Sequence, residues 1–260
     1  MSSRRGAAHS LPWAMLALGG LLLSMLALPV IVLLLSASLA AMGETLIEGE
    51  TLRSLQVTLL AAGISTAFGL AMGVPLAYVL ARYRFRGQRL VEGVLGLPVI
   101  IPHTSAGVAL LLTYGARGPV GALFKQVGVF FTDHLLGVAV AMCFVSVSYL
   151  VNSAREAIAA IHPELEQAAL VDGASPWGVF WKVTLPLAQR GITNGALLMW
   201  ARGISEFGAV VLLAYHPRTL SVLVYERFQG FGLARATPLA ALLVIVALIV
   251  FAILSARYTE

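Results

Sequence analysis

The stretch ELEQAALVDGASPWGVFWKVTLP, residues 164–186, is a polar segment with glycines and prolines that lies between two long apolar runs. It predicts two short helices. Pro163 suits the first position of the first helix, and Glu164 and Glu166 fall in its first turn, where the helix dipole favours acids. Gly173 then predicts the end of that helix, because glycine readily adopts the left-handed conformation of a helix stop.

The second helix of this segment is predicted to begin after Ser175. The serine hydroxyl can cap the helix, and Pro176 suits its first position. Trp177, Phe180 and Trp181 are spaced i, i+3 and i+4, so they share one face of this helix.

The first helix carries Leu165, Ala168 and Ala169 on a single face. The small alanines would let a partner surface approach closely. The alternative is an amphipathic pair of helices lying on the membrane surface. Such helices are usually rich in basic residues, and Lys182 is the one basic residue of this pair. A contact with a cytoplasmic partner is therefore the favoured interpretation.

The composition of the whole chain is that of a membrane protein. Of its 260 residues, 59% are hydrophobic and 11% are charged, whereas soluble domains have about 25% charged residues. The mean hydropathy is +0.91. The net charge of +5 is attributed to Lys and Arg at the cytoplasmic ends of helices rather than to nucleic-acid binding. The single cysteine, Cys143, cannot form an internal disulfide.

Six apolar runs are long enough to cross about 30 Å of hydrocarbon. They show no alternation of polar and apolar residues, so they are expected to be helices rather than strands of a barrel. The first run is longer than the roughly 7–15 residues of a signal peptide's apolar region, so we expect it to be retained. The predicted spans of this single permease domain, residues 1–260, are 13–38, 54–81, 90–114, 135–160, 191–215 and 237–257, with a cytoplasmic loop at 161–190.

The distribution of basic residues predicts the orientation of these spans. With a cytoplasmic N-terminus, the inner side carries ten of them: Arg4, Arg5, Arg82, Arg84, Arg86, Arg89, Arg155, Lys182, Arg190 and Arg257. The outer side carries six: Arg53, Arg117, Lys125, Arg218, Arg227 and Arg235. Both termini are therefore expected in the cytoplasm.

The second span contains Gly69 and Gly73, and such a pair of small residues four apart lets helices approach closely. Packing within the subunit is favoured over a contact between subunits.

The third span contains Pro98 and Pro102, and the latter is followed by His103, Thr104 and Ser105. A kink is expected at Pro102, which has no backbone N–H to donate. Freed carbonyls and clustered hydroxyls suit a wet or protein-lined surface, so this segment is a candidate lining of a transport pathway. The alternative for His103 is a hydrogen-bonded histidine in the protein interior.

The fifth span contains Arg202 and Glu206, four residues apart and therefore on one helix face. Charged side chains are unfavourable in hydrocarbon, so both are expected to face the bundle interior and to pair. A place on the wall of a pathway or gate is the functional interpretation. An ion pair that only fixes helix packing is the structural one.

Several segments together resemble the tungstate/molybdate permeases of ABC importers. They are GVPLAYVLAR at 73–82, LPVIIPHTSAG at 97–107, WARGISEFGAVV at 200–211, AYHP at 214–217 and VYERF at 224–228. The 164–186 stretch resembles the loop by which permeases of this class dock on their ATPase. Sulfate permeases share a similar Glu-Phe-Gly-Ala segment, so sulfate is the alternative anion.

The resemblance implies an all-α membrane protein of the type I ABC-importer permease architecture, with six transmembrane helices. It implies two sets of functional residues. The ATPase-coupling set is Glu164, Glu166, Gln167, Ala168, Ala169, Gly173, Ala174, Ser175 and Pro176. The pathway or gate set is Pro102, His103, Thr104, Ser105, Arg202 and Glu206. In the family the loop often begins Glu-Ala-Ala, but here Gln167 precedes the two alanines, so an acid that contacts the ATPase would have to be Glu166.

The partners that the resemblance implies are a second copy of this chain, two cytoplasmic ABC ATPase subunits and an extracytoplasmic oxyanion-binding protein. The complex would lie in the cell membrane. ATP and magnesium are then expected on the ATPase, with no cofactor or metal in this chain. In agreement with this division, the sequence has no phosphate-binding G-x-x-x-x-G-K-[ST] loop.

Two other classes of protein were weighed. An intramembrane hydrolase would need a base within hydrogen-bond reach of a serine such as Ser205, and no zinc-binding H-E-x-x-H motif is present. A secondary transporter would be expected to show inverted repeats and paired broken helices, and no such repeat is detected.

Overall fold

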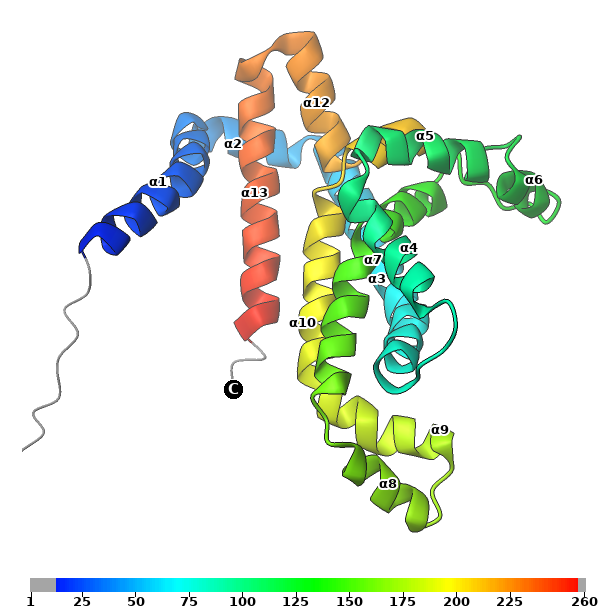
Figure 1. Cartoon of the computed structure of the whole chain (residues 1–260). Helices are drawn as coiled ribbons and strands as arrows, with labels where there is room; N and C mark the ends of the chain where they lie inside the picture. The colour runs from blue at the N-terminus through cyan, green and yellow to red at the C-terminus, as the bar shows by residue number, and fades with distance from the viewer. Residues whose placement is uncertain (1–12, 257–260) are drawn as a thin grey trace, which may run out of the picture.

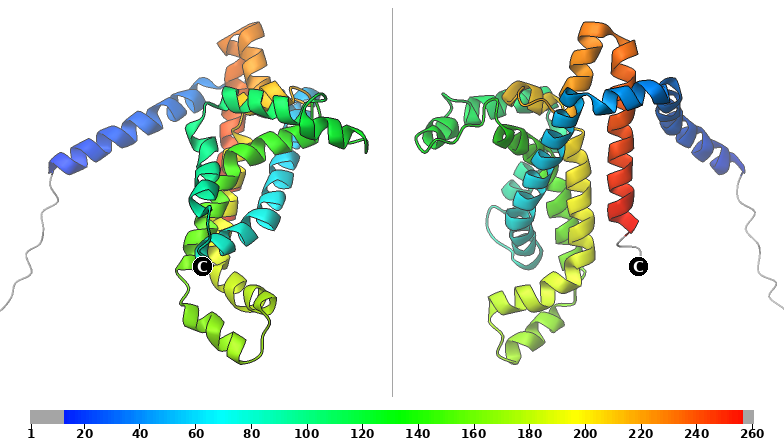
Figure 2. Two further views of the ribbon diagram at one scale, coloured as in Figure 1. Left: turned by 45° about the vertical axis from the view of Figure 1, so that its right-hand side comes forward. Right: turned by 180° about the vertical axis from the view of Figure 1, so that it is seen from behind.

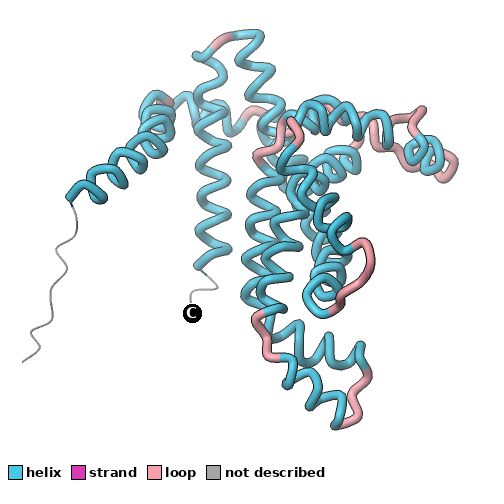
Figure 3. The backbone as a smooth tube through the Cα atoms, in the orientation of Figure 1, coloured by secondary structure: helices cyan, strands magenta, loops and turns pink. Residues whose placement is uncertain are grey.

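In the computed structural model, which describes residues 13–256, every regular element is helical (Figure 1, Figure 3). The elements are α1 (Trp13–Ser36), α2 (Leu39–Ile47), α3 (Gly49–Arg82), α4 (Gln88–Ile100), α5 (His103–Tyr114), α6 (Pro119–Lys125), α7 (Leu135–Ala159), α8 (Pro163–Val171), α9 (Pro176–Val179), the π-helical turn η1 (Phe180–Thr184), α10 (Leu185–Ile204), α11 (Gly208–Leu213), α12 (Leu220–Phe231) and α13 (Leu233–Ala256).

The core is formed where α3, α7 and α10 pack together. Small residues on α3 allow this close approach. A side-chain carbon at Gly69 would lie 2.5 Å from the sulfur of Met199 on α10, and one at Gly73 would lie 3.0 Å from Val151 on α7. The glycine pair therefore packs inside the subunit, as the sequence favoured.

The third predicted span, 90–114, is not one kinked helix but two helices, α4 and α5, which meet at an angle of 118°. Pro102 explains the break. The residue before a proline is driven out of the helical region, and Ile101 has the extended angles φ −80° and ψ 142°. Helix α4 therefore ends at Ile100, and α5 starts in a new direction after the proline.

The fifth predicted span, 191–215, is also interrupted. Helix α10 ends at Ile204, and a short helix, α11, follows from Gly208. By length and hydropathy alone, three described helices (α1, α3 and α7) are long and apolar enough to span a membrane, and the α4–α5 pair would make a fourth. The predicted count of six spans is thus not confirmed, although α10 packs against both α7 and α13 (Figure 1).

The molecule has two distinct ends and one outlying helix. Helices α8 and α9 project at one end, and the turn between α12 and α13 lies at the other (Figure 1). Helix α1 leaves the body on the far side of α13, as both views in Figure 2 show. Its last turns contact α13 through the half-buried Leu33 and Leu34, whereas the remaining described side chains of α1 are exposed.

Candidate functional site

The first candidate site is the projecting loop, and its first helix begins and ends as predicted. Pro163 occupies the first turn of α8. At the other end Gly173 has φ +88°, in the left-handed region that favours glycine. Its N–H donates to Leu170 O at 3.0 Å, and the N–H of Ala174 donates to Ala169 O at 3.0 Å. These bonds satisfy carbonyls that would otherwise be free at the helix end.

The second helix of the loop starts as predicted but does not stop. The Ser175 hydroxyl accepts a hydrogen bond from Gly178 N at 3.1 Å, and Pro176 occupies the first turn. The chain then stays helical through η1 and into α10 without a break. Pro186 accounts for the π-helical turn, because a proline has no N–H and its ring clashes with the carbonyl four residues earlier.

Much of the loop's surface is apolar and uncovered. Val171 is 87% exposed and Trp177 is 65% exposed. Phe180, which was expected to share an outer face with the two tryptophans, is buried and stacks on Trp177 with the ring centroids 5.5 Å apart. Gln167 and Ala168 are exposed. Exposed apolar surface of this kind is typical of sites that contact another protein or a membrane.

Glu166 is the exception among the predicted coupling residues, because it faces inward. Only 8% of the residue is exposed. Its Oε2 lies 2.9 Å from Arg82 Nε at the end of α3, and its Oε1 accepts a hydrogen bond from the Thr184 hydroxyl at 2.6 Å. Glu164, in the same turn, is exposed. In the sequence Arg82 stands out as a determinant of orientation and as the end of the 73–82 segment, and nothing singles out Thr184, since no local pattern joins segments so far apart in the chain.

The second candidate site lies where α5 meets the gap between α10 and α11. The predicted ion pair is present: Arg202 Nη2 lies 3.0 Å from Glu206 Oε2. Arg202 is in the last turn of α10, but Glu206 lies beyond that helix rather than within it. Its Oε1 accepts a hydrogen bond from Ala209 N at 2.8 Å, so the same carboxylate caps α11. Only 2% of Glu206 is exposed.

His103, at the start of α5, joins this pair. Arg202 Nη2 lies 2.7 Å from His103 Nε2. The same Nη2 lies 3.4 Å from His103 Nδ1, which in turn lies 3.5 Å from Glu206 Oε2.

The two interrupted helices are held close together. A side-chain carbon at Gly208, the first residue of α11, would lie 2.9 Å from the His103 Cβ. The Ser221 hydroxyl of α12 donates to the Glu206 carbonyl at 2.7 Å. Pro102, Thr104 and Ser105 are exposed in the single chain. The site therefore combines a buried carboxylate, a partly buried arginine, a histidine that contacts both, and an open, hydroxyl-bearing helix start.

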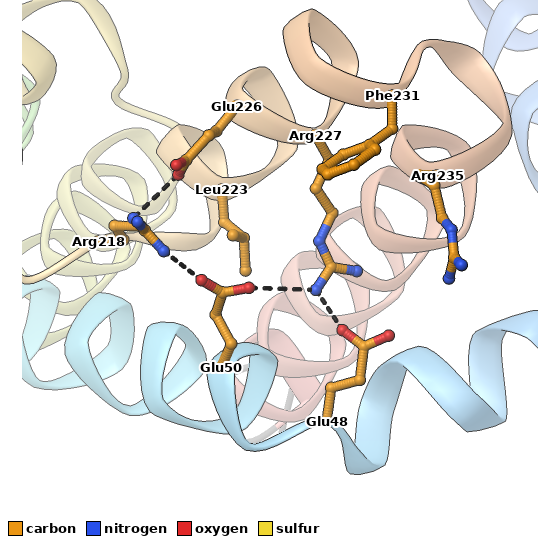
Figure 4. A pocket seen from close by; sticks show the side chains of 8 residues that line it. All are labelled: Glu48, Glu50, Arg218, Leu223, Glu226, Arg227, Phe231 and Arg235. Carbon is orange, nitrogen blue, oxygen red and sulfur yellow. Dashed lines mark hydrogen bonds and ion pairs between the residues drawn. The ribbon is translucent and has the colours of Figure 1, made fainter.

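A third charged cluster, which sequence analysis did not anticipate, lies at the end of the molecule opposite α8. Figure 4 shows that Arg227 pairs with Glu48 and Glu50, and that Arg218 pairs with Glu50 and Glu226. The Arg218–Glu226 distance is 2.9 Å and the Arg227–Glu50 distance is 3.6 Å. This outer ion network ties the start of α3 to α12.

Comparison with known proteins identifies the family. Residues 65–259 match the family model described as "Binding-protein-dependent transport system inner membrane component". The chain belongs to this family. It is accordingly a multi-pass membrane protein and the permease subunit of an ABC importer, a transport component rather than an enzyme. This result argues against the hydrolase and the secondary transporter.

The relatives of this permease are named for the transport of molybdate and tungstate or for the transport of sulfate. It is 36% identical over 93% of its length to the molybdate/tungstate transport system permease protein WtpB of Pyrococcus furiosus, 92% of which is covered. It is 34% identical over 92% of its length to a probable sulfate transport system permease protein of Chlorokybus atmophyticus, 86% of which is covered.

The fold agrees with that of a solved importer. A chain in the crystal structure of a bacterial ABC transporter involved in the import of the acidic polysaccharide alginate superimposes with a TM-score of 0.75. The alignment covers 95% of this permease and 94% of that chain, at 20% identity. The type I importer architecture implied by the resemblance is thus supported at the level of the fold.

Proposed function

We propose that this permease forms the membrane pathway through which an ATP-driven importer takes up molybdate and tungstate. The observation that carries the proposal is the full-length similarity to the Pyrococcus molybdate/tungstate permease. Sulfate is the second candidate, because a sulfate permease is similar over nearly the same length. All three anions are tetrahedral and doubly charged, so the pathway would have to accommodate the same shape and charge in each case.

Arg202, Glu206 and His103 form a cluster at the break between α10 and α11. This cluster is better suited to line a pathway than to bind an anion tightly. Glu206 lies 3.0 Å from Arg202, so it repels an oxyanion and also competes for the guanidinium. An importer gains nothing from holding its substrate in mid-membrane, because the anion must leave again. We therefore assign high affinity to a separate extracytoplasmic binding protein, and we assign the lining of a gate to Pro102, His103, Thr104 and Ser105.

The exposed face of the projecting loop is the proposed docking site for a cytoplasmic ABC ATPase. Gln167, Ala168 and Gly173 lie on its surface, and the loop presents apolar side chains as large as Trp177. ATP and magnesium would be bound by that ATPase. With the loop in the cytoplasm, α13 also ends on the cytoplasmic side, since it points toward the same end of the molecule (Figure 1).

A second copy of the permease would complete the pathway. Helix α1 supports this arrangement, because it is apolar and nearly all of its described surface is exposed in one chain. A symmetric pair would present two projecting loops, one for each of two ATPase subunits.

Uptake into liposomes tests this function. The permease is reconstituted with its ATPase, and the binding protein is added outside together with radiolabelled molybdate, tungstate or sulfate. ATP-dependent accumulation of molybdate and tungstate is expected, with little inhibition by a large excess of sulfate. Preferential accumulation of sulfate would support the second candidate. Absence of uptake of all three anions would contradict the proposal.

A further inference from the structure

Arg82 holds three parts of the cytoplasmic end together. It is the last residue of α3, and its side chain is only 12% exposed. Besides the Nε contact with Glu166, its Nη2 donates to Glu166 Oε1 at 3.2 Å and to Ile161 O at 3.1 Å. Ile161 lies in the connection between α7 and α8. One guanidinium thus contacts both the start of the loop and its first helix.

Glu166 also connects α8 to α10. Its Oε1 also accepts the hydroxyl of Thr184, the last residue of the π-helical turn. Since η1 continues into α10 without a break, Glu166 bridges α3 and α10 from a position on α8. Both carboxylate oxygens have partners within the chain and only 8% of the residue is exposed, so Glu166 presents little surface to an ATPase.

The loop needs such a connection. Helix α8 has nine residues, and helices shorter than about 12–15 residues are marginal on their own. Much of its surface is exposed, including Leu165 and Val171. Without Glu166 it would be held by its packing on α9 and η1. A displacement applied to a loosely attached α8 would move α8 without moving α3 or α10.

We propose that Arg82 is a positioning residue for energy coupling, acting through Glu166. The pair fixes α8 on the end of α3, so that a displacement of the loop by the ATPase moves α3 and α10 as one body. This inference rests on the proposed docking of an ATPase at the loop. It reverses the expected role of Glu166, which becomes an internal support rather than a contact with the partner.

The first test compares anions imported per ATP hydrolysed in the reconstituted complex. The variants are Arg82→Gln, Glu166→Gln and the charge reversal Arg82→Glu/Glu166→Arg. The matched control is Glu156→Gln, which removes an exposed acid near the end of α7, outside the ATPase-coupling set. Both single neutralisations are expected to lower import per ATP by about tenfold or more, because a partly buried pair left with one charge is strongly destabilised. The reversal should restore part of it, and ATPase co-purification should stay near the wild-type yield.

The second test needs neither substrate nor ATPase. Spin labels are placed at Val171 on α8 and Met72 on α3, which are 87% and 60% exposed, in a Cys143→Ser background of the full-length permease in lipid nanodiscs. The distance distribution between the labels should broaden in Arg82→Gln and Glu166→Gln, stay unchanged in Glu156→Gln, and narrow again in the reversal. This readout separates the inference from the proposed function, since it is informative even if the imported solute is not an oxyanion.

Two outcomes would overturn the inference. One is loss of ATPase co-purification in Glu166→Gln but not in Arg82→Gln, which would make Glu166 a direct partner contact. The other is wild-type import per ATP and an unchanged label distance in both single variants.

Discussion

Glu206 is nearly fully buried, and each of its carboxylate oxygens has a partner. Removing a carboxylate from water is unfavourable unless charge and hydrogen bonds replace the water. Arg202 supplies the charge, and the N–H of Ala209 supplies a hydrogen bond. The carboxylate thus has two roles, since it neutralises an arginine of α10 and also starts α11.

We expect Arg202→Ala and Glu206→Ala each to destabilise the permease, because either change leaves one charge without its partner. The loss should reach about 3–5 kcal/mol in Arg202→Ala, which leaves the buried Glu206 carboxylate unpaired, and should be smaller in Glu206→Ala, because the Arg202 side chain is 24% exposed. The double change should recover part of the loss, but not all of it, since the cap of α11 is still missing. Glu206→Gln, which keeps a hydrogen-bond acceptor, should be milder than Glu206→Ala. Thermal unfolding of the purified permease in detergent measures these differences.

The control for this prediction is the pair of Arg155 and Glu92, which lie 2.9 Å apart but whose side chains are about one third exposed. Arg155→Ala should cost less than about 1 kcal/mol, as for most surface ion pairs. A double Arg202→Ala/Glu206→Ala variant no more stable than the worse single variant would contradict the pairing.

At the scale of the helices, local sequence signals predicted where a helix starts or stops, but they were poorer at predicting whether a long helix continues without a break. Ser175, Pro176 and Gly173 act through atoms within three or four residues of themselves, so their roles were readable from sequence. The break at Pro102 was anticipated as a kink. The gap at residues 205–207 was not, because it contains neither proline nor glycine and is held open by the contact of Glu206 with a backbone amide.

The end of α8 offers a test of one such local signal. Gly173→Ala should weaken the helix stop by about 1–2 kcal/mol, because φ +88° is strained for any side chain. Gly173→Asn should be milder, since asparagine tolerates this conformation better. Nothing lies within 4 Å of the added carbon, so backbone strain and not a clash inside the subunit is being measured.

The readout for these two variants is the yield of ATPase that co-purifies with the permease. Yield should fall in the order wild type, Gly173→Asn, Gly173→Ala, while insertion into the membrane is unchanged. Equal yields for alanine and asparagine would show that the left-handed turn does not govern docking.

The start of α5 offers a second test at this scale. Thr104 is exposed in the single chain and follows directly on the interrupted segment. We expect a cysteine at this position, in a Cys143→Ser background, to react with small polar thiol reagents at a rate that depends on the nucleotide bound to the ATPase. Leu110→Cys, at a buried position of the same helix, is the control and should stay unreactive. Failure of Thr104→Cys to react in every nucleotide state would place this segment in packed protein.

At the scale of the whole molecule, the sequence indicated membrane helices and the loop but not how distant parts meet. The Glu166–Arg82 contact spans 84 residues and the Arg202–His103 contact spans 99. In each contact, neither of the two sequence segments by itself predicts that its residue meets the other. Hydropathy likewise gave the apolar runs, yet it could not show that α1 would stand apart from its own bundle.

The position of α1 leads to a prediction about assembly. A photoreactive group attached at Met25→Cys, in a Cys143→Ser background, should yield a product of twice the chain's mass in native membranes, because Met25 is 71% exposed. The same group at Leu34, where α1 already contacts its own α13, should react mainly within one chain. Lipid adducts alone at Met25 would show that α1 does not meet a second copy.

The outer ion network has a consequence for the conditions under which the permease is handled. Its acidic members Glu48, Glu50 and Glu226 are 35–47% exposed at the side chain, so the surrounding solution reaches them. Dissolved ions screen such charges, over about 10 Å at 0.1 M and only about 3 Å at 1 M. High ionic strength should therefore weaken the ionic contacts that attach α12 to the start of α3, whereas the less accessible Arg202–Glu206 pair should hardly respond. A rise in the ionic strength of the medium at that face should thus loosen this end of the permease selectively. The salt concentration of the buffer then affects the structure of the purified protein.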